Sequence, residues 1–565
     1  MTTLTAAMPA SKGFAMGKAY VIEKQDLRAD IYNVAPEHIN LEIEKFDKAV
    51  KEATKQIESF AANSDLFRAH LELVGDMSLY EGVINRIRSE NQNAQLALEK
   101  TVAEISTIFN NIEDQYIKER NDDIIDIRTR LMRILKGTSN TSFDNISEEV
   151  IIVAENLVLS DTSYLNLDYV LGFVTEFGGV TSHVSIIARS LELPALVGIK
   201  DLMKIIKKGD YLILDASKGK LFINPDEATI AQYKVLKQSY EEINKKVAAL
   251  SHLPATTQDG KTVKISANVG NLDDIKKAIR YNIDGIGLFR SEYLYMNNTH
   301  FPTEEEQFEV YKEAALLCGK DLTIRTMDIG GDKLLPYYPF AHEDNPFLGW
   351  RAIRISLELK DIFKTQLRAI LRASAFGNIK IMYPMIISME ELITANELLK
   401  ECMEELRAEK LPYNPNILVG IMIETPAAVL CADNFAKHVD FFSIGTNDLT
   451  QYILAIDRGN YKISSMFDSF HPAVILSIKK VIEAGHANKI PVGMCGEFAG
   501  DETATILLLG LGLDEFSMSA SDAANIKNII RNSYYERAKE CAAKASSLYT
   551  IKEVKECLAS HCKLS

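Results

Sequence analysis

The sequence predicts an α/β protein: an N-terminal α/β domain with an inserted helical bundle, then a helical linker, then a C-terminal (β/α)8 barrel of the TIM type. Three observations predict this class. An early region carries apolar residues at helical spacing, the region after it is rich in β-branched runs, and the last roughly 300 residues alternate strand-like and helical patterns. A chain of 565 residues is long enough for several separate cores.

The helical bundle is predicted for residues 33–137. Apolar side chains there follow each other at steps of three and four, as on one face of an amphipathic helix. The clearest run is Ile39, Ile43, Phe46, Val50, Ala53, Ile57 and Phe60. The range has room for about four such helices. It carries no obvious catalytic set, so a scaffold role is the simplest interpretation.

The small α/β domain is predicted to combine residues 1–32 with 138–225. A helix is expected at 184–191, and strand-like runs occur at 18–22, 150–153, 169–174 and 211–214. Residues 228–250 then carry apolar side chains on one helical face, which indicates a helical linker over 226–260. The barrel domain is expected to occupy 261–565.

The barrel is predicted from apolar, β-rich segments that helical patterns mostly separate. The eight segments are 262–268, 284–289, 322–328, 379–385, 418–424, 439–445, 490–495 and 513–518. In such a barrel the chemistry lies at the carboxyl ends of the strands. Polar residues fall at those ends, namely Arg290, Arg325, Glu424, Asn447, Asp448 and Cys495. We therefore expect these side chains to meet at one mouth.

Composition excludes several classes of protein. The formal net charge is −15, whereas bulk nucleic-acid binding needs a basic face. The seven Cys are widely spaced without a C-x-x-C pair, so a disulfide framework or zinc site is not expected and a reducing cytoplasm fits best. The first twenty residues lack the pattern of a signal peptide, and no apolar run approaches the roughly 18 residues of a membrane span.

His183 is the candidate nucleophile of the α/β domain. It follows Gly178 and Gly179 and directly precedes the predicted helix. An exposed imidazole with a pKa of about 6.5 is a good nucleophile near neutral pH. Helix N–H groups and the hydroxyls of Thr181 and Ser182 could bind a transferred phosphate. The alternative is a capping segment with an incidental His, which the double Gly makes less attractive.

The barrel residues suit an anionic substrate and a divalent metal. An Arg within an apolar strand, such as Arg325, is costly unless paired, and its fork suits phosphate or carboxylate. The alternative is a structural salt bridge. Glu424 and Asp448 at adjacent strand ends could hold Mg²⁺, although an ion pair and a helix N-cap are the simpler alternatives. A lone Cys such as Cys495 is usually a small core residue.

Residues 178–195 resemble the phosphohistidine motif of the phosphoenolpyruvate-utilising enzymes, and the nearest resemblance is to enzyme I of the bacterial sugar phosphotransferase system. The resemblance covers nearly the whole chain and is strongest in 172–198 and 284–520. It implies that His183 carries phosphate on Nε2. Val180 departs from the motif, because enzyme I often has a basic residue there, and this puts one contact to the phosphate in question.

The same resemblance implies roles for the barrel residues and names partners. Cys495 would be the proton donor, and Glu424 and Asp448 would hold Mg²⁺. Phosphoenolpyruvate (PEP) would be bound by Arg290, Arg325, Lys333, Arg351, Asn447, Asp448 and Arg458. The phosphocarrier protein HPr would dock on the helical bundle, whose acidic excess would suit a basic partner. A homodimer through the barrel domain is also implied.

Two other readings of the sequence have to be weighed. A PEP synthase or pyruvate phosphate dikinase would need a nucleotide-binding domain, for which the chain leaves no room. A non-catalytic regulatory relative would lack some of the Arg, Glu, Asp or Cys set, and none is missing. We therefore expect a phosphotransferase that moves phosphate from PEP to His183 and on to HPr, with the linker permitting the domains to swivel.

Overall fold

The computed structural model divides into two compact units, Met1–Glu242 and Ile243–Ser565. It describes residues 2–4, 8–22, 27–61, 71, 73–110, 115–137, 146, 148–157, 167–178, 184–185, 188, 191, 193–250, 252–296, 298–331, 333, 335, 337–458, 460, 462–463 and 466–562. The division between the units falls within the predicted linker 226–260. The finer domain boundaries stay predictions.

The first unit contains a mixed eight-stranded sheet in the order β1-β8-β7-β3-β4-β5-β6-β2. Its strands are β1 (Thr2–Leu4), β2 (Met8–Ser11), β3 (Phe14–Val21), β4 (Val150–Ala154), β5 (Val170–Thr175), β6 (Ala195–Val197), β7 (Tyr211–Asp215) and β8 (Lys220–Ile223). The N-terminal strand β3 lies in the centre, parallel to β4 and antiparallel to β7. Both faces of β4 are buried, which explains its uninterrupted apolar run.

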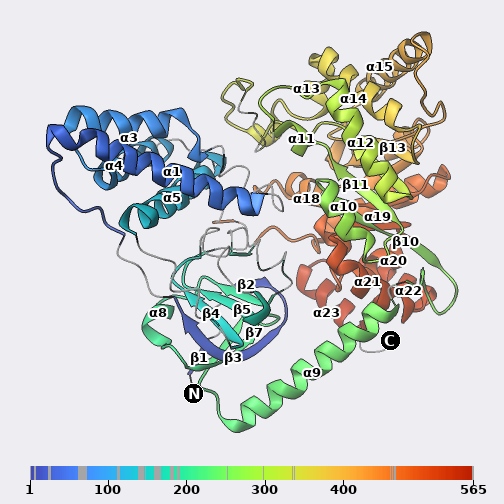
Figure 1. Ribbon diagram of the computed structural model, residues 1–565. Helices are drawn as coiled ribbons and strands as arrows, with labels where there is room; N and C mark the ends of the chain where they lie inside the picture. The colour runs from blue at the N-terminus through green and yellow to red at the C-terminus, as the bar shows by residue number, and fades with distance from the viewer. Residues whose placement is uncertain are drawn as a thin grey trace. The chain divides into compact units, whose positions relative to one another are not determined.

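The same unit contains the helices predicted for 33–137. Four are described there: α1 (Ile39–Ala61), α3 (Met77–Glu90), α4 (Ala94–Asn110) and α5 (Gln115–Lys136). Phe46, Ala53 and Ile57 of the predicted apolar face are buried in their common core. Figure 1 shows these helices running alongside one another, drawn in blue to teal. The bundle expected from the periodicity is therefore present.

Helix α9 (Glu227–Leu250) matches the helix predicted at 228–250 and continues across the division between the units. Its first turns pack on the sheet of the first unit. Tyr233 lies against Phe222, with ring centroids 5.0 Å apart, and its hydroxyl donates a 3.1 Å hydrogen bond to the buried carboxylate of Asp215. A short helix, α8 (Leu202–Ile205), precedes it. The helix expected at 184–191 lies largely outside the described residues.

The second unit is a closed parallel barrel, as predicted. All eight predicted segments form strands: β10 (Thr262–Val269), β11 (Gly285–Arg290), β12 (Asp321–Arg325), β13 (Ile379–Tyr383), β14 (Leu418–Ile423), β15 (Phe441–Ile444), β16 (Val492–Met494) and β17 (Glu515–Met518). Each pairs in parallel with the next, and β10 pairs with both β11 and β17, which closes the ring. A short strand, β9 (Ala255–Thr256), adds to β10 in antiparallel fashion.

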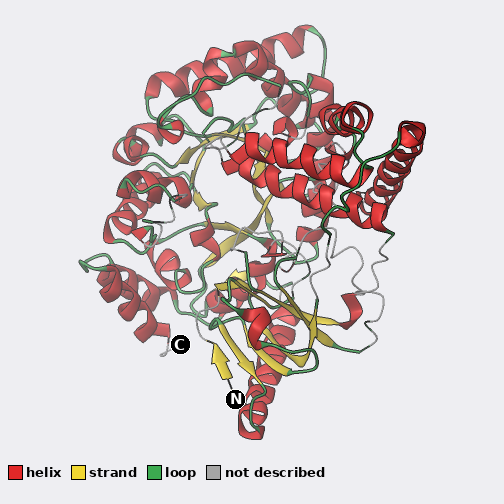
Figure 2. Ribbon diagram, turned by 90° about the vertical axis from the view of Figure 1, so that its left-hand side faces the viewer, coloured by secondary structure: helices red, strands yellow, loops and turns green. Residues whose placement is uncertain are grey.

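Helices follow the strands and cover the outside of the barrel (Figure 2). They are α10 (Leu272–Ile279), α11 (Glu292–Met296), α12 (Glu304–Cys318), α13 (Ile353–Glu358), α14 (Lys360–Ala373), α15 (Met389–Ala408), α16 (Pro426–Leu430), α17 (Ala432–Phe435), α18 (Thr446–Leu454), α19 (Pro472–Ala487), α20 (Thr505–Leu511), α21 (Ala523–Arg531), α22 (Tyr535–Ala545) and α23 (Ile551–Cys562). One large apolar core lies between the strands and these helices. Among the described residues, no helix is both long and apolar enough to cross a membrane.

Candidate active site

Four strands of the barrel bring predicted polar residues to one of its ends. Arg290 ends β11 and Arg325 ends β12, and the two are partners in the parallel register. Glu424 directly follows β14, and Cys495 directly follows β16. Because parallel strands in a barrel end at the same rim, these side chains share the mouth where such barrels carry their chemistry.

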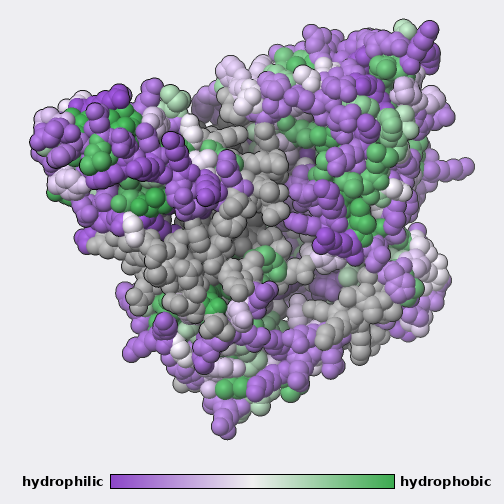
Figure 3. All heavy atoms as spheres, in the orientation of Figure 1, coloured by the Kyte–Doolittle hydropathy of each residue, from purple (hydrophilic) through white to green (hydrophobic). Residues whose placement is uncertain are grey.

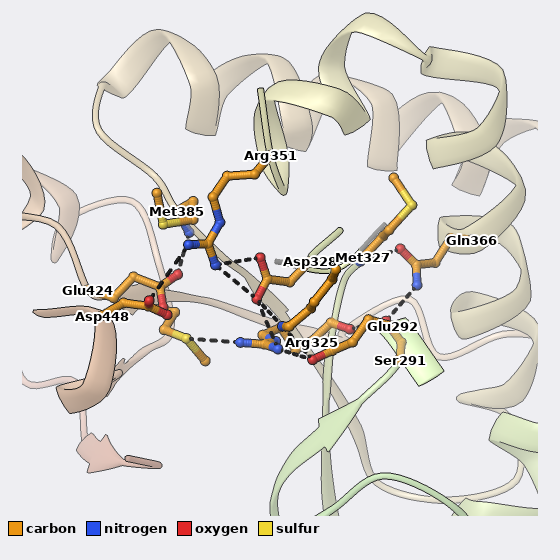
Figure 4. Close-up of polar contacts among 12 residues, drawn as sticks. Ser291, Glu292, Arg325, Met327, Asp328, Arg351, Gln366, Met385, Glu424 and Asp448 are labelled. Carbon is orange, nitrogen blue, oxygen red and sulfur yellow. Dashed lines mark hydrogen bonds and ion pairs between the residues drawn. The ribbon is translucent and has the colours of Figure 1, made fainter. Parts of the chain in front are cut away.

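Asp328, just beyond β12, joins three cations at this mouth (Figure 4). Its Oδ2 lies 3.1 Å from the Arg325 guanidinium and 2.8 Å from Lys333 Nζ. Its Oδ1 accepts a 3.0 Å hydrogen bond from Arg351. Burial alone opposes ionisation of Asp328, but Arg351, Lys333 and Arg325 outweigh it and hold the pKa of the carboxyl well below its usual range. The residue is therefore a buried, ionised carboxylate that three cations surround.

Glu292 of α11 is the second acidic residue of this network. Its Oε1 accepts a short hydrogen bond from Arg325 and a 2.9 Å bond from Lys333. Burial favours the neutral acid, but the two cations keep the pKa of Glu292 below its ordinary value. Arg325 is therefore a salt-bridged residue, as one interpretation of the sequence expected, and it lies at the barrel mouth. Its role toward an anionic substrate stays a prediction.

Arg351 reaches the cluster from the segment before α13 and is only 2% exposed. Besides Asp328 it contacts the hydroxyl of Tyr452, at 3.1 Å, and Oδ1 of Asp448, at 3.6 Å. Nearby carboxylates keep it charged despite its burial, and the pKa of the guanidinium lies well above its usual value. Arg351 therefore connects the cation cluster around Asp328 to Asp448 in the first turn of α18.

Glu424 and Asp448 have oxygens that fit a metal ligand set. The backbone N–H of Met385 donates a 2.6 Å hydrogen bond to Glu424 Oε1, while Glu424 Oε2 and Asp448 Oδ1 are buried with no hydrogen-bond partner among the described residues. Buried polar atoms of this kind need an explanation, and a bound cation supplies one. A Cβ added at Gly445 would lie 2.9 Å from Glu424 Oε2, so the glycine keeps this space open.

The electrostatics of Glu424 and Asp448 also favour a bound cation. Burial and the negative charges of Asp448 and Asp328 raise the pKa of Glu424 to about 8. Two carboxylates that repel each other in a dry site are stabilised by a divalent cation. Asp448 is not the N-cap of α18, because Gly445 holds that position. In the part of the chain that the structure describes, no group of three or more His, Cys, Asp and Glu side chains forms a denser metal site.

Cys495 lies inside the mouth and is 4% exposed. It packs with Leu288, Met382 and Met422 in the barrel interior. Burial raises the pKa of its thiol to about 11, against the smaller opposing effects of Ser443 and Arg325. The thiol is therefore protonated at neutral pH, which is the state that a proton donor requires.

Three further predicted residues differ in how closely they join the cluster. Lys333 belongs to the cluster, because its ammonium group donates to both Asp328 and Glu292. Asn447, in the first turn of α18, accepts a 3.3 Å hydrogen bond from the backbone N–H of Glu497 and so lies beside the segment that follows Cys495. Arg458 is fixed through its backbone N–H, which donates to Gln451. Among the described residues, no hydrogen bond or ion pair joins the Arg458 side chain to the cluster.

Sequence reasoning missed three buried polar residues that organise this mouth: Glu292, Asp328 and Gln366. Gln366 of α14 accepts a 2.8 Å hydrogen bond from the backbone N–H of Met327 and donates a 3.0 Å bond to Ser291. For Glu292 and Asp328 the sequence did offer a signal, because each is an acidic residue within three positions of an arginine at a strand end. Such a carboxylate is the natural partner of a buried guanidinium.

His183 lies outside the described residues, as do Val180, Thr181 and Ser182. The described residues on either side agree with a glycine-rich turn before a helix. Gly178 has a φ of 120°, and Val184 and Ser185 are helical and buried. The role of His183 therefore stays a prediction.

Comparisons with known proteins give the family. A model described as the PEP-binding domain of the PEP-utilising enzymes matches residues 244–535. Models for the N-terminal part and the mobile domain of the same enzymes match residues 6–120 and 146–219. The phosphoenolpyruvate-protein phosphotransferase of Haemophilus influenzae is 45% identical over 555 residues, which is 96% of each chain. The chain belongs to the phosphoenolpyruvate-protein phosphotransferase family.

Other members of this family match over a similar length. The phosphoenolpyruvate-protein phosphotransferase of Bacillus subtilis is 42% identical, covering 96% of this chain and 97% of the relative. Among solved structures, the solution structure of Enzyme I (nEIt) is 35% identical with a TM-score of 0.37, covering 42% of this chain and 100% of that chain. The family models and the relatives that match nearly the full chain confirm, at the level of the family, the resemblance drawn from residues 178–195 to PEP-utilising enzymes.

Proposed function

We propose that this member of the family transfers the phosphoryl group of PEP to Nε2 of its own His183 and from there to a histidine of HPr, with release of pyruvate as the first step of sugar uptake. The observation that carries the proposal is the buried cluster of Arg325, Lys333, Arg351 and Asp328 at the carboxyl ends of a closed parallel barrel. Beside it lie two carboxylates, each with one buried oxygen that accepts no hydrogen bond among the described residues.

The cations at the mouth suit the two anionic groups of PEP. A phosphate and a carboxylate need several positive groups held at fixed positions, and guanidinium forks bind both in a bidentate manner. Arg290, Arg325, Arg351 and Lys333 supply the charge, and Arg458, Asn447 and Asp448 complete the predicted binding set. Positive groups that are already in place stabilise the charge that spreads over the phosphoryl oxygens during transfer.

Glu424 and Asp448 would hold Mg²⁺ in this proposal. The support is that Glu424 Oε2 and Asp448 Oδ1 are buried and accept no hydrogen bond among the described residues, together with the raised pKa of Glu424. With Mg²⁺ held by these two residues, the site would gain positive charge for phosphoryl transfer. The chain itself orients this site, because the Met385 N–H fixes one oxygen of Glu424 and leaves the other available.

Cys495 would protonate the methylene carbon to complete pyruvate. Its thiol lies within the mouth, and a pKa of about 11 keeps the proton on sulfur until a basic carbon is presented. The three-dimensional placement distinguishes it from Cys402, which is buried in outer helix α15. Among the described side chains of the barrel unit, the other thiols lie in or between the outer helices.

HPr and a second copy of the chain are the proposed protein partners. Residues 33–137 would form the HPr-binding subdomain, inserted in a phosphohistidine domain of residues 1–32 and 138–225. Residues 226–260 would link it to the barrel domain, 261–565, through which a homodimer would form. Apolar side chains such as Ile279 of α10 and Leu316 of α12 are exposed on that unit, and Figure 3 shows apolar atoms among the hydrophilic ones over its outer helices.

The cytoplasm is the proposed location. Cys318, Cys402, Cys431 and Cys495 are free thiols, as expected of a reducing compartment.

Incubation with ³²P-labelled PEP and Mg²⁺ tests the proposal. We expect acid-labile, base-stable label on the peptide that contains His183, and we expect the label to leave the protein when HPr is added. His183→Ala is the matched control, because it keeps the barrel and removes the acceptor. Label on a different residue, or phosphate relay by His183→Ala, would exclude the proposed role of His183.

A further inference from the structure

We propose that Asp328 is a positioning residue that sets the spacing of the three cations receiving the substrate, so that its charge is needed for the rate of phosphoryl transfer rather than for the binding of PEP. The inference rests on the proposed function, because it takes Arg325, Lys333 and Arg351 to be the groups that meet PEP.

Asp328 can set the spacing of the cations because both of its carboxylate oxygens contact them. Oδ2 contacts Arg325 and Lys333, at 3.1 and 2.8 Å, and Oδ1 contacts Arg351 at 3.0 Å. The residue is 1% exposed, so water does not compete for these contacts. Figure 4 shows the carboxylate between the guanidinium groups of Arg325 and Arg351. A charged hydrogen bond in such a dry site is strong and directional.

The three cations come from three different segments, and Asp328 is what they share. Arg325 ends strand β12, and Lys333 lies in a tight turn in which it exchanges two backbone hydrogen bonds with Gly330. Arg351 comes from the segment before α13. No single helix or strand therefore fixes the distances among the cations. Glu292 contacts Arg325 and Lys333, whereas Arg351 lies within ion-pair distance of Asp328 and Asp448.

The backbone around Asp328 is built for close contact with the Arg351 segment. The N–H of Ala352 donates a 2.8 Å hydrogen bond to the carbonyl of Ile329. Gly330 has a φ of 96°, and a Cβ there would lie 2.4 Å from the carbonyl oxygen of Trp350. Any side chain at Gly330 would push the two segments apart. The main chain thus brings the two segments together, and the ion pair with Asp328 then holds the Arg351 guanidinium in place.

The charges explain why Asp328 affects rate more than binding. Removal of one carboxylate raises the positive charge of the pocket by one unit, which favours an anionic substrate. The same removal leaves Glu292 to compensate Arg325 and Lys333, and Asp448 at 3.6 Å to compensate Arg351. The carboxylate shared by all three cations is then gone, so that their mutual repulsion increases and their spacing relaxes. Small errors in the placement of reacting groups reduce the rate by about 100-fold. Loss of kcat without a rise in KM is therefore the expected signature.

Asp328→Asn tests the inference, since it keeps the shape of the side chain and removes the charge. We expect kcat for His183 phosphorylation by PEP to fall by about 100-fold, while KM for PEP stays within about 3-fold of wild type or decreases. Glu292→Gln should show a smaller fall of about 10-fold, because Arg351 remains held by Asp328.

Two controls separate positioning from general damage. Asp321→Asn removes a carboxylate that, like Asp328, is paired with cations, but at the amino ends of the strands. Its partners are Lys264 and Lys380, at 2.9 and 2.7 Å. We expect its kcat to equal that of wild type. The second control loads His183 from phosphorylated HPr, a step that does not use the barrel, and Asp328→Asn should perform it at the wild-type rate.

The outcomes are distinguishable. Wild-type protein that forms no phosphohistidine from PEP would overturn the proposed function. A functional wild type together with a wild-type kcat in Asp328→Asn, or with a rise in KM as the main effect, would overturn the inference about Asp328. If Asp328→Asn does not fold, as judged by circular dichroism, then Glu292→Gln decides: a lower kcat at unchanged KM supports positioning, and an unchanged kcat overturns it.

Discussion

The backbone N–H of Met385 donates a 2.6 Å hydrogen bond to Oε1 of Glu424 and leaves Oε2 of the same carboxylate buried with no hydrogen-bond partner among the described residues. Met385 adopts a φ of 57°, a left-handed conformation that an L-residue other than Asn or Asp rarely adopts. Strained backbone of this kind persists where the surrounding structure holds it, often at functional sites. The strained backbone at Met385 thus fixes the orientation of the Glu424 carboxylate at the rim of the barrel.

Stability of the metal-free protein should decrease with pH because of Glu424. Its pKa is raised from 4.5 to about 8 in the folded state, so between these values the folded protein holds a proton that the unfolded chain has lost. The contribution of this group to the free energy of unfolding therefore falls as the pH rises through that window. Urea unfolding of wild type and Glu424→Gln over this range measures the difference, and we expect a flatter dependence in the variant.

Mg²⁺ provides the companion measurement for the same residue. At pH 8 the added ion should raise the urea midpoint of the wild type, because it binds the ionised carboxylates of the folded state only. Glu424→Gln should respond much less. Parallel pH dependences in the two proteins, or equal stabilisation by Mg²⁺, would argue against this carboxylate as a ligand.

Replacement of Cys495 should separate the two halves of the PEP reaction. Cys495→Ala removes the proposed proton donor, so steady-state pyruvate formation should fall by about 100-fold or more. Lactate dehydrogenase coupling measures the pyruvate. The matched control is Cys402→Ala, which removes another fully buried thiol of the barrel unit, outside the mouth, and should keep wild-type turnover. Wild-type pyruvate formation in Cys495→Ala would remove the thiol from the mechanism.

Thiol alkylation should discriminate the exposed from the buried cysteines. Cys431 is exposed, whereas Cys495 is buried and carries a neutral thiol up to a pKa of about 11. Since the thiolate is the reactive form, iodoacetamide at pH 8 should modify Cys431 first. Peptide mass spectrometry at successive times follows both sites. Activity should survive the first modification, and preferential early labelling of Cys495 would contradict the buried placement.

Gln366 should be important for stability and for the rim of the mouth. The side chain is fully buried and bonds the Met327 N–H, Ser291 and the hydroxyl of Tyr311. Gln366→Leu leaves the Met327 N–H without its acceptor, while the hydroxyls of Ser291 and Tyr311 keep their bonds to the Arg325 carbonyl and to Gln307. We expect the free energy of unfolding to fall by roughly 1–3 kcal/mol. Urea unfolding measures the change, and Lys360→Ala, at the exposed start of the same helix, is the control. A loss below about 0.5 kcal/mol would show that water replaces the lost bonds.

The barrel could be predicted from the sequence because its strands are buried on both sides. Segments such as 379–385 and 418–424 form short apolar runs between helical patterns, and that signal needs no knowledge of tertiary contacts. The ends of the strands then follow, so Arg325 and Glu424 could be placed at the mouth. The roles of these residues remain predictions, whereas the fold is confirmed.

Asp328 and Glu292 could not be assigned in the same way. Both lie in connections just beyond strands, and loop geometry decides which cation each side chain meets. Arg458 illustrates the reverse: its charge made it a candidate, but the structure engages only its backbone among the described residues. The position of a residue along a strand predicts at which end of the barrel it lies. The partners of its side chain depend on the path of the loops around it.

The pairing of β10 with β17 has a consequence for biosynthesis. These strands come from opposite ends of the barrel sequence, and their contacts, such as Ser517 with Asn268, join residues 249 positions apart. The ring cannot close on the ribosome until nearly the whole chain has emerged, so the early strands spend that time with one edge unpaired. Chaperone dependence during synthesis is therefore expected to be concentrated in the second half of the chain.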